Sequence, residues 1–259
     1  MTKRAVLAIH GFSGHPEEMR FLGTKIADRL QARLYLPTLL GHATKPEDLL
    51  STMAEDWYRQ VEATYDRLRK RHQEVIVLGN SFGANLALKL ARHRPVRAVV
   101  ALSIPYVRWY QRWQLKILIA INKPFRQFWT KPRKGPRATE QIPGYQQRCY
   151  ERIPLRAMEE LLRFEMNEMQ TCQLGAVQSP TLLVVPRGDP FVPAEAANVY
   201  RGRLGSQTKD ILLWDDPYHL IVQGQRKEAL AATIIDWLEN QLGFVFEPKS
   251  GNSESNTNI

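Results

Sequence analysis

The sequence is poor in cysteine and has no long hydrophobic run, and each shortage excludes a class of protein. Its two cysteines, Cys149 and Cys172, are too few for a disulfide framework, and no spacing of cysteine and histidine is typical of a metal site. No stretch reaches the roughly 18 apolar residues that span a bilayer. The first apolar run, at 5–9, is too short for the core of a signal peptide. We therefore expect a cytoplasmic protein that needs no metal and no cofactor.

The net charge of the chain is concentrated in one segment. The 259 residues, 44% hydrophobic and 24% charged, have the composition of a globular protein and fit one large domain, or a domain with a smaller subdomain. The segment 105–156 contains 12 lysines and arginines against 2 acidic residues, which accounts for the whole net charge of +10. Such a local excess indicates a specific surface rather than a general aid to solubility.

Short aliphatic runs alternate with helical patterns along most of the chain. The helix expected at 54–71 carries Trp57, Val61, Tyr65 and Leu68 at spacings of four, four and three. The alternation predicts an α/β fold, with a mostly parallel sheet covered by helices on both faces. We expect strands at 5–9, 33–36, 75–78, 97–102, 181–185 and 210–214, and further helices at 16–30, 82–93, 193–204 and 225–242.

This alternation stops at Pro105. Between 105 and 178 the sequence shows helical segments broken by prolines and no convincing strand. We interpret 105–178 as a mainly helical cap inserted into an α/β core made of 1–104 and 179–243. The last residues, 244–259, are rich in serine and asparagine and have little to bury, so we expect them to be disordered.

A candidate nucleophile lies in the third expected strand-to-helix turn. Gly79-Asn80-Ser81-Phe82-Gly83 matches the G-x-S-x-G pattern between a strand and a helix, which is the context that this motif requires. The two glycines leave room where a Cβ would clash in such a tight turn. Because five residues with three fixed positions recur by chance, the motif needs catalytic partners elsewhere in the chain.

Two later loops supply these partners. A serine hydroxyl needs a base to take its proton, and the base needs a third group to fix its tautomer. Such groups lie in loops at the carboxyl ends of parallel strands. Asp189 follows the strand 181–185, and His219 follows the strand 210–214. Asp215 and Asp216 are rivals to Asp189, but their closeness to the histidine in sequence disfavours them.

The other histidines have less specific readings. His72 and His93 lie at basic helix ends, where a solvated or helix-capping role is expected. His15 begins a helix and His42 lies in a loop. Either could line a cleft, but neither follows a late strand.

Two backbone N–H groups are candidates for an oxyanion hole, which binds the negative charge that develops on a substrate oxygen. Phe82 directly follows the nucleophile, and Phe12 lies in the loop after the first strand. Gly11 would let the substrate approach. His10 either braces this loop or takes part in the chemistry. We therefore assign His10, Gly11 and unspecified cap residues to substrate binding.

Taken together, these motifs resemble those of small bacterial carboxylesterases in the branch of the α/β-hydrolase superfamily that includes monoacylglycerol lipases. The matching segments are His10-Gly-Phe-Ser-Gly14, Gly41-His42, Gly79-Asn-Ser-Phe-Gly83, Gly188-Asp-Pro-Phe-Val-Pro193 and Tyr218-His219. The resemblance implies the α/β-hydrolase fold and esterase activity through Ser81, Asp189 and His219, with Phe12 and Phe82 as oxyanion donors. Family members often have Gly-His-Gly where this chain has Gly41-His42-Ala43, and the cap matches no pattern that defines a substrate.

The cap combines basic and apolar residues. Arg108, Arg112 and Lys116 form a basic stripe beside the apolar stripe Trp109, Trp113, Ile117 and Ile121, and the aromatics Phe125, Phe128 and Trp129 interleave with Lys123, Arg126, Lys131, Arg133 and Lys134. The apolar side chains could cover an acyl chain. Alternatively, the surface could dock on anionic lipid at the inner face of the membrane. The same pattern fits nucleic acid, but no reader motif supports that partner.

The sequence therefore predicts a serine hydrolase that cleaves small carboxylic esters with an apolar acyl chain through an acyl-enzyme. It would be a carboxylesterase or a lipase of the monoacylglycerol type. A cofactor-free perhydrolase would use the same triad. The alternative from another class is a catalytically silent α/β-hydrolase that acts as a membrane-surface or binding scaffold.

Overall fold

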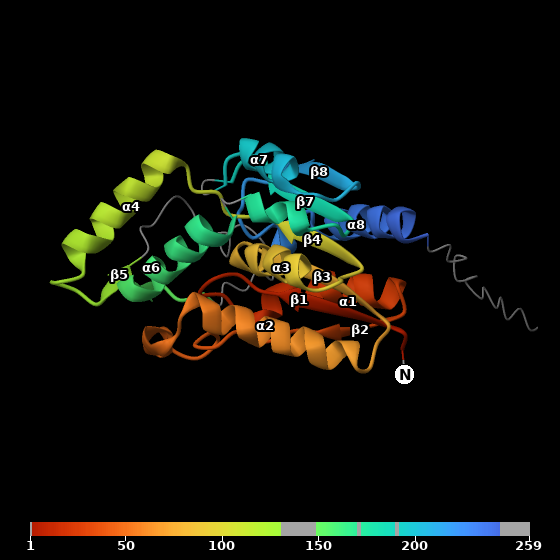
Figure 1. Cartoon of the computed structure of the whole chain (residues 1–259), viewed down its shortest axis with the longest axis horizontal. Coiled ribbons are helices and arrows are strands. Elements are labelled where there is room, and N and C mark those ends of the chain that lie inside the picture. Colours follow the sequence, from red (N-terminus) through yellow and green to blue (C-terminus); the bar gives the residue numbers. More distant parts are fainter. Residues whose placement is uncertain (1, 131–148, 170–171, 190–191, 244–259) are drawn as a thin grey trace, which may run out of the picture.

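The computed structural model describes residues 2–130, 149–169, 172–189 and 192–243. Its centre is a six-stranded sheet in the order β2-β1-β3-β4-β7-β8, and every neighbouring pair of strands is parallel (Figure 1). The strands are β1 (Arg4–Ile9), β2 (Ala32–Tyr35), β3 (Glu74–Asn80), β4 (Ala98–Leu102), β7 (Thr181–Pro186) and β8 (Lys209–Trp214).

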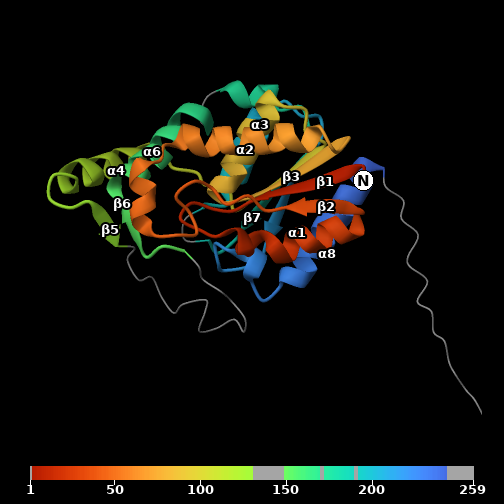
Figure 2. The same cartoon turned by 90° about the horizontal axis from the view of Figure 1, so that it is seen from below.

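Helices cover both faces of this sheet, as Figure 2 shows from below. The first apolar cluster packs α2 (Ala54–Arg69), α3 (Phe82–His93) and α7 (Glu195–Arg203) on one face. The second packs α1 (Arg20–Arg29) and α8 (Lys227–Leu242) on the other face. The prediction of a parallel sheet with two helical layers is confirmed.

The strand sequences explain why both faces are covered. In β1, Ala5, Leu7 and Ile9 belong to the first cluster, while Val6 and Ala8 belong to the second. Side chains alternate between the faces of a strand, so a continuous apolar run has to be buried on both. A strand between two helical layers therefore needs a continuous apolar run such as 5–9, and not an alternation of apolar and polar residues.

One expected helix is split into two kinds of helix. The segment expected at 16–30 forms the short 3₁₀ helix η1 (Pro16–Met19) and then α1. His15 caps η1, because the Glu17 N–H donates a hydrogen bond of 3.1 Å to His15 Nδ1. The structure thus places His15 as a helix cap.

The chain between β4 and β7 extends beyond one end of the sheet (Figure 1). It contains α4 (Trp109–Asn122), α6 (Leu155–Phe164), the π-helix η3 (Glu165–Met169) and the 3₁₀ helix η4 (Cys172–Ala176). It also contains β5 (Phe128–Thr130) and β6 (Arg152–Pro154), which pair antiparallel, so the expectation of no strand in 105–178 is wrong. Strands of three residues are too short to show an alternating pattern, and their partners here lie far apart in sequence.

The division into an α/β core and a cap stays a prediction. Residues 131–148, including Lys131, Arg133 and Lys134, lie outside the described residues, as does the tail 244–259. In the described ranges, no helix combines the length and the apolar character needed to cross a membrane.

Candidate active site

Ser81 lies in a sharp turn between β3 and α3. Its backbone has φ 52° and ψ −122°, a conformation that L-residues rarely adopt. The turn is held by a 2.8 Å hydrogen bond from the Ser81 N–H to the Leu102 carbonyl. A Cβ on Gly79 would lie 2.2 Å from the Gly83 carbonyl oxygen, and one on Gly83 would lie 2.3 Å from the Ile9 carbonyl oxygen. Glycine is therefore required at both positions to present this serine.

The structure brings Ser81, His219 and Asp189 together at the carboxyl end of the sheet. His219 Nε2 lies 2.8 Å from Ser81 Oγ, and His219 Nδ1 lies 2.6 Å from Asp189 Oδ2. The Asp189 side chain is fully buried, while that of His219 is 26% exposed. Because a carboxylate can only accept a hydrogen bond, it favours the imidazole tautomer with the proton on Nδ1, in which the lone pair of Nε2 faces Ser81 Oγ.

Backbone bonds fix both partners of the serine. The Val192 N–H donates to Asp189 Oδ1 at 3.1 Å, so the second carboxylate oxygen is also occupied. Ser103, fully buried after β4, donates from Oγ to the His219 carbonyl at 2.7 Å. The motifs in the sequence did not point to Ser103. Its one signal was its place at the end of a buried strand, on the edge where Ser81 lies.

The rivals of Asp189 do not take its place. Asp216 is buried and accepts a hydrogen bond of 2.9 Å from the Tyr218 N–H, and its carbonyl accepts one of 3.3 Å from Gly188. Burial raises the pKa of Asp216. Asp216 therefore ties the loops after β7 and β8 to each other, while Asp215 is exposed.

His10 is fully buried and braces the loop after β1. Its Nδ1 lies 2.9 Å from the Gly11 carbonyl, and the Leu39 N–H donates to its Nε2 at 3.1 Å. Burial lowers the pKa of His10 to about 3, with the nearby His42 acting in the same direction. Both ring nitrogens bond to backbone, as bracing of the loop requires, and the assignment of His10 to substrate binding stays a prediction. A Cβ on Gly11 would lie 3.2 Å from Ser81 Cβ, which shows how close this loop comes to the serine.

The two candidate oxyanion donors follow these positions in the chain. Phe12 comes after Gly11, and Phe82 comes after Ser81 as the first residue of α3, where N–H groups have no partner inside the helix. Within the described part of the chain, no acceptor takes a hydrogen bond from either N–H. The two rings meet edge to face at 6.3 Å, and each also packs against Trp57. The aromatic cluster thus holds both donor segments.

His42 and His72 are both buried inside the fold. His42 is buried, and its ring lies 5.6 Å from that of Trp57; burial lowers its pKa to about 4. His72 is buried too, which excludes the solvated role of the two that were expected, and its backbone N–H donates to the Leu68 carbonyl at 2.8 Å at the end of α2. Tyr35 Oη and the Thr2 carbonyl lie 2.9 and 2.8 Å from its ring nitrogens. Among the residues described, no group of three or more histidines, cysteines and carboxylates is placed to hold a metal ion.

Comparison with known proteins agrees with this architecture. The model of the Alpha/beta hydrolase family matches residues 6–233, so the chain belongs to that family. A carboxylesterase of Bacillus subtilis (strain 168) is 24% identical over 240 residues, covering 91% of this chain and 92% of the relative. A thermostable monoacylglycerol lipase of Bacillus sp. (strain H-257) is 30% identical over 226 residues, covering 83% and 82%. Both relatives are carboxylic ester hydrolases.

A solved structure reported for two metagenome-derived lipolytic enzymes has the same fold. It superimposes with a TM-score of 0.78 at 24% identity, covering 92% of this chain and 94% of the other. The predicted α/β-hydrolase fold is therefore confirmed by sequence and by structure.

Proposed function

We propose that the protein hydrolyses carboxylic esters through an acyl-enzyme on Ser81. His219 takes the Ser81 proton as Oγ attacks the ester carbonyl, and Asp189 stabilises the imidazolium that forms. The N–H groups of Phe12 and Phe82 bind the oxyanion. His219 then gives its proton to the leaving alcohol. Water attacks the acyl-enzyme by the same path, which releases the acid and restores Ser81.

One observation carries this proposal: the unbroken chain of contacts from Ser81 Oγ to His219 Nε2, at 2.8 Å, and from His219 Nδ1 to Asp189 Oδ2, at 2.6 Å. These distances are those of a nucleophile, a general base and the group that orients the base. The strained backbone of Ser81 adds support, because strain of this kind gathers at functional sites. A purely structural serine would need neither the strain nor a buried carboxylate behind its histidine.

The substrate we propose is a small ester with an apolar acyl chain, of the carboxylesterase or monoacylglycerol type. Support comes from the two relatives, one named a carboxylesterase and the other a monoacylglycerol lipase. Hydrolysis rates on p-nitrophenyl esters of increasing chain length would define the acyl preference, and a parallel series of monoacylglycerols would test the alcohol half.

A fluorophosphonate probe, which reacts with activated serines, tests the mechanism and separates it from the silent scaffold. The wild-type protein should be labelled, and its esterase activity should fall in proportion to the fraction that is labelled. Ser81→Ala should not be labelled, whereas Ser51→Ala, which removes an exposed serine, should behave as wild type. A folded wild type that stays unlabelled would favour the scaffold.

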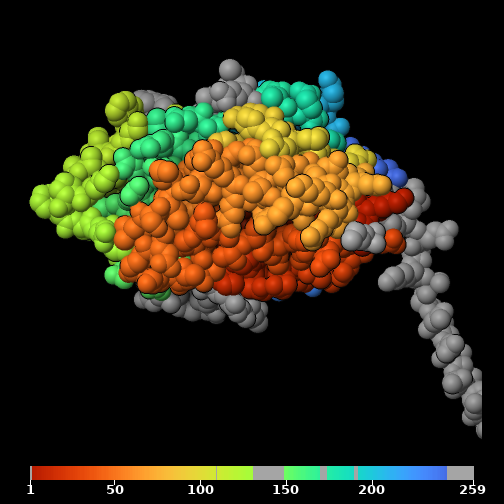
Figure 3. Space-filling view, turned by 60° about the horizontal axis from the view of Figure 1, so that its bottom comes forward, coloured from red at the N-terminus to blue at the C-terminus, as the bar shows by residue number. Residues whose placement is uncertain are grey.

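We further propose that the cap contacts anionic membrane. The α4 helix exposes Trp113 (63%), Ile117 (55%) and Ile121 (61%) at spacings of four, and Phe125 (86%) follows just after its end. This helix lies at one extremity of the molecule (Figure 3). Lys116 Nζ lies 5.4 Å from the Trp113 ring, so a cation flanks the apolar stripe. Apolar side chains beside cations are what an anionic interface favours.

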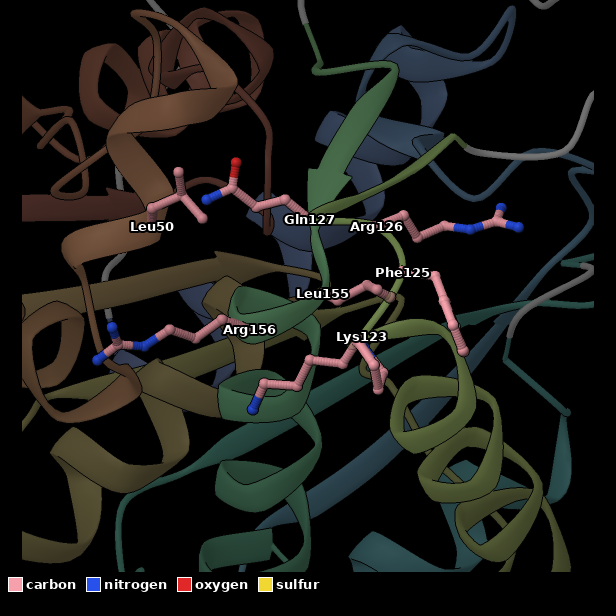
Figure 4. Close-up of a pocket in the computed structure, with 8 residues that line it drawn as sticks. Leu50, Lys123, Phe125, Arg126, Gln127, Leu155 and Arg156 are labelled. Carbon is pink, nitrogen blue, oxygen red and sulfur yellow. The ribbon is translucent and has the colours of Figure 1, made fainter.

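A hollow beside Phe125 adds to this surface. It measures about 520 Å³ and is lined by Lys123, Arg126 and Arg156 together with Phe125 and Leu155 (Figure 4). Lys123 Nζ is paired with Glu159 at 2.7 Å, so Arg126 and Arg156 are the cations that this hollow offers to an anionic headgroup, next to the exposed Phe125 ring.

Sedimentation with lipid vesicles tests this contact. We expect binding to phosphatidylglycerol vesicles, weaker binding to phosphatidylcholine, and loss of binding in the double variant Trp113→Ser, Ile117→Ser. Leu213→Ser, which changes an exposed leucine on β8, is the control. Equal binding to both kinds of vesicle would contradict an anionic partner.

A further inference from the structure

Glu18 is a buried carboxyl group beneath the candidate oxyanion loop. It belongs to η1, and little of the residue is exposed. The Gly11 N–H donates a short hydrogen bond of 2.5 Å to Glu18 Oε1. The Asn80 side-chain amide donates to the same oxygen at 3.4 Å. One carboxyl oxygen thus joins the residue before Phe12 to the residue before Ser81.

The second oxygen of Glu18 is held as closely. A Cβ on Gly14 would lie 2.6 Å from Glu18 Oε2, so only glycine leaves space for the carboxyl group there. The loop closes over it through a 3.1 Å hydrogen bond from the Gly14 N–H to the Gly11 carbonyl. The loop 11–14 therefore wraps around the Glu18 side chain, which makes that side chain part of the loop's own structure.

Burying a carboxyl group is costly unless polar partners compensate for the lost water. Burial raises the pKa of Glu18, while the hydrogen bonds from Gly11 and Asn80 and the nearby His219 act in the opposite direction. The mechanism proposed above gives this group no chemical step. An apolar residue could fill the same volume without the cost, so what Glu18 adds is its hydrogen bonds.

We propose that Glu18 is a positioning residue that holds the two oxyanion donors in register. Fixing the Gly11 N–H limits the orientation of the next peptide, whose N–H belongs to Phe12. Fixing the Asn80 side chain limits the turn that carries Ser81 and the Phe82 N–H. Because oxyanion donors must be aimed at one point before the reaction, a link between their two segments acts on the rate of the chemical step. This role rests on the proposed esterase function.

Two substitutions of Glu18 separate its hydrogen bonds from its volume and its charge. Glu18→Met keeps the approximate volume and removes both acceptors. Glu18→Gln removes any charge but keeps one oxygen for Gly11 and Asn80. With a short-chain p-nitrophenyl ester, Glu18→Met should lower kcat by about 10- to 100-fold, the range for a donor displaced by about an ångström. KM should change by less than about 3-fold, because the oxyanion forms only in the transition state. Glu18→Gln should recover most of the lost kcat.

The matched control is Glu17→Gln, one residue away on η1. Its carboxylate pairs with Arg20 at the surface, 2.5 Å from Nη2, and kcat should stay at the wild-type value. Binding of a trifluoromethyl ketone, whose adduct carries an oxyanion, should weaken in Glu18→Met by the same factor as kcat/KM. A loss of packing alone would not reproduce this match.

Three results would overturn the inference: a folded Glu18→Met with wild-type kcat, equal losses in the Met and Gln variants, or a loss that appears only in KM. If Glu18→Met does not fold, Gly14→Ala displaces the same carboxyl group without altering it. It should lower kcat in the same way, and wild-type kcat there would count against the proposal. A wild type that hydrolyses no ester would overturn the proposed function first, whereas an active wild type with an unaffected Glu18→Met would overturn only the positioning role.

Discussion

Replacing Asp189 with asparagine should reverse the tautomer of His219. The Val192 N–H donates to Asp189 Oδ1 at 3.1 Å, so the amide oxygen of the new side chain has to stay at that position. The NH₂ group then faces His219 Nδ1, which is 2.6 Å from the present Oδ2. If the amide were flipped, its NH₂ group would face the Val192 N–H, and two hydrogen-bond donors would point at each other. The asparagine therefore forces His219 Nδ1 to accept, and the imidazole proton moves to Nε2, opposite Ser81.

A histidine in that tautomer cannot take the serine proton. Loss of the correct tautomer in a serine triad costs about 10⁴-fold in kcat, which corresponds to about 5.4 kcal/mol of transition-state stabilisation. KM should change little, because Asp189 is buried behind the histidine. Stability should also change little, since the amide keeps the shape and the Val192 bond of the carboxylate.

The assay compares steady-state ester hydrolysis and the rate of fluorophosphonate labelling in wild type and Asp189→Asn. Asp215→Asn, which changes an exposed carboxylate after β8, is the control and should match wild type. A folded Asp189→Asn that keeps kcat within about 10-fold of wild type would refute the tautomer argument, because most of the expected loss of about 10⁴-fold would then be missing.

Three further predictions concern folding. Gly79→Ala should abolish cooperative thermal unfolding, because its Cβ would lie 2.2 Å from the Gly83 carbonyl oxygen, whereas Gly202→Ala, with no atom within 4 Å of the new Cβ, should be at least as stable as wild type. His42 stays neutral in the folded state, where its pKa is about 4, but takes a proton in the unfolded chain below 6.5. Stability should therefore fall as the pH drops from 6.5 toward 4, by about 2 kcal/mol at pH 5. In urea unfolding, His42→Gln should therefore lose about 2 kcal/mol less of its unfolding free energy than wild type between pH 6.5 and pH 5. The same pH dependence in both proteins would contradict this prediction. Phe164→Ala should lower the free energy of unfolding by about 3–5 kcal/mol, because the α6 ring packs 5.2 Å from that of Phe82; a change below about 1 kcal/mol would show that this contact contributes little.

The three residues of the candidate triad could be predicted from the sequence because of where they lie relative to the strands. Ser81 follows the buried strand β3, Asp189 follows the buried strand β7, and His219 follows the partly exposed edge strand β8. Because parallel strands end at the same edge of the sheet, the three residues meet there. The order of the runs along the chain was enough to expect one site at that edge. The central strands β1, β3, β4 and β7 were visible because burial on both faces makes them continuously apolar.

Other features were hidden because their signal is not local. Ser103 acts through one hydrogen bond to the distant His219 carbonyl. Glu18 accepts hydrogen bonds from the Gly11 N–H and the Asn80 side chain, and nothing in the sequence around either residue marks these bonds. The β5–β6 pair joins residues on either side of 131–148, and three residues per strand carry no periodicity. His72 lies among basic residues, which suggested a solvated or helix-capping role, and nothing in the sequence showed that its ring reaches inward to Tyr35.

The most direct test of the account is to trap the covalent intermediate. Wild type would be mixed with p-nitrophenyl butyrate, quenched in acid within milliseconds, digested and analysed by mass spectrometry. An acyl-enzyme mechanism predicts a butyryl group on the Ser81 hydroxyl, at higher occupancy when low temperature slows the attack by water, and no adduct in Ser81→Ala. Two results would contradict the assignment of Ser81 as the nucleophile: an acyl group found on another residue, or a Ser81→Ala variant that still hydrolyses the ester.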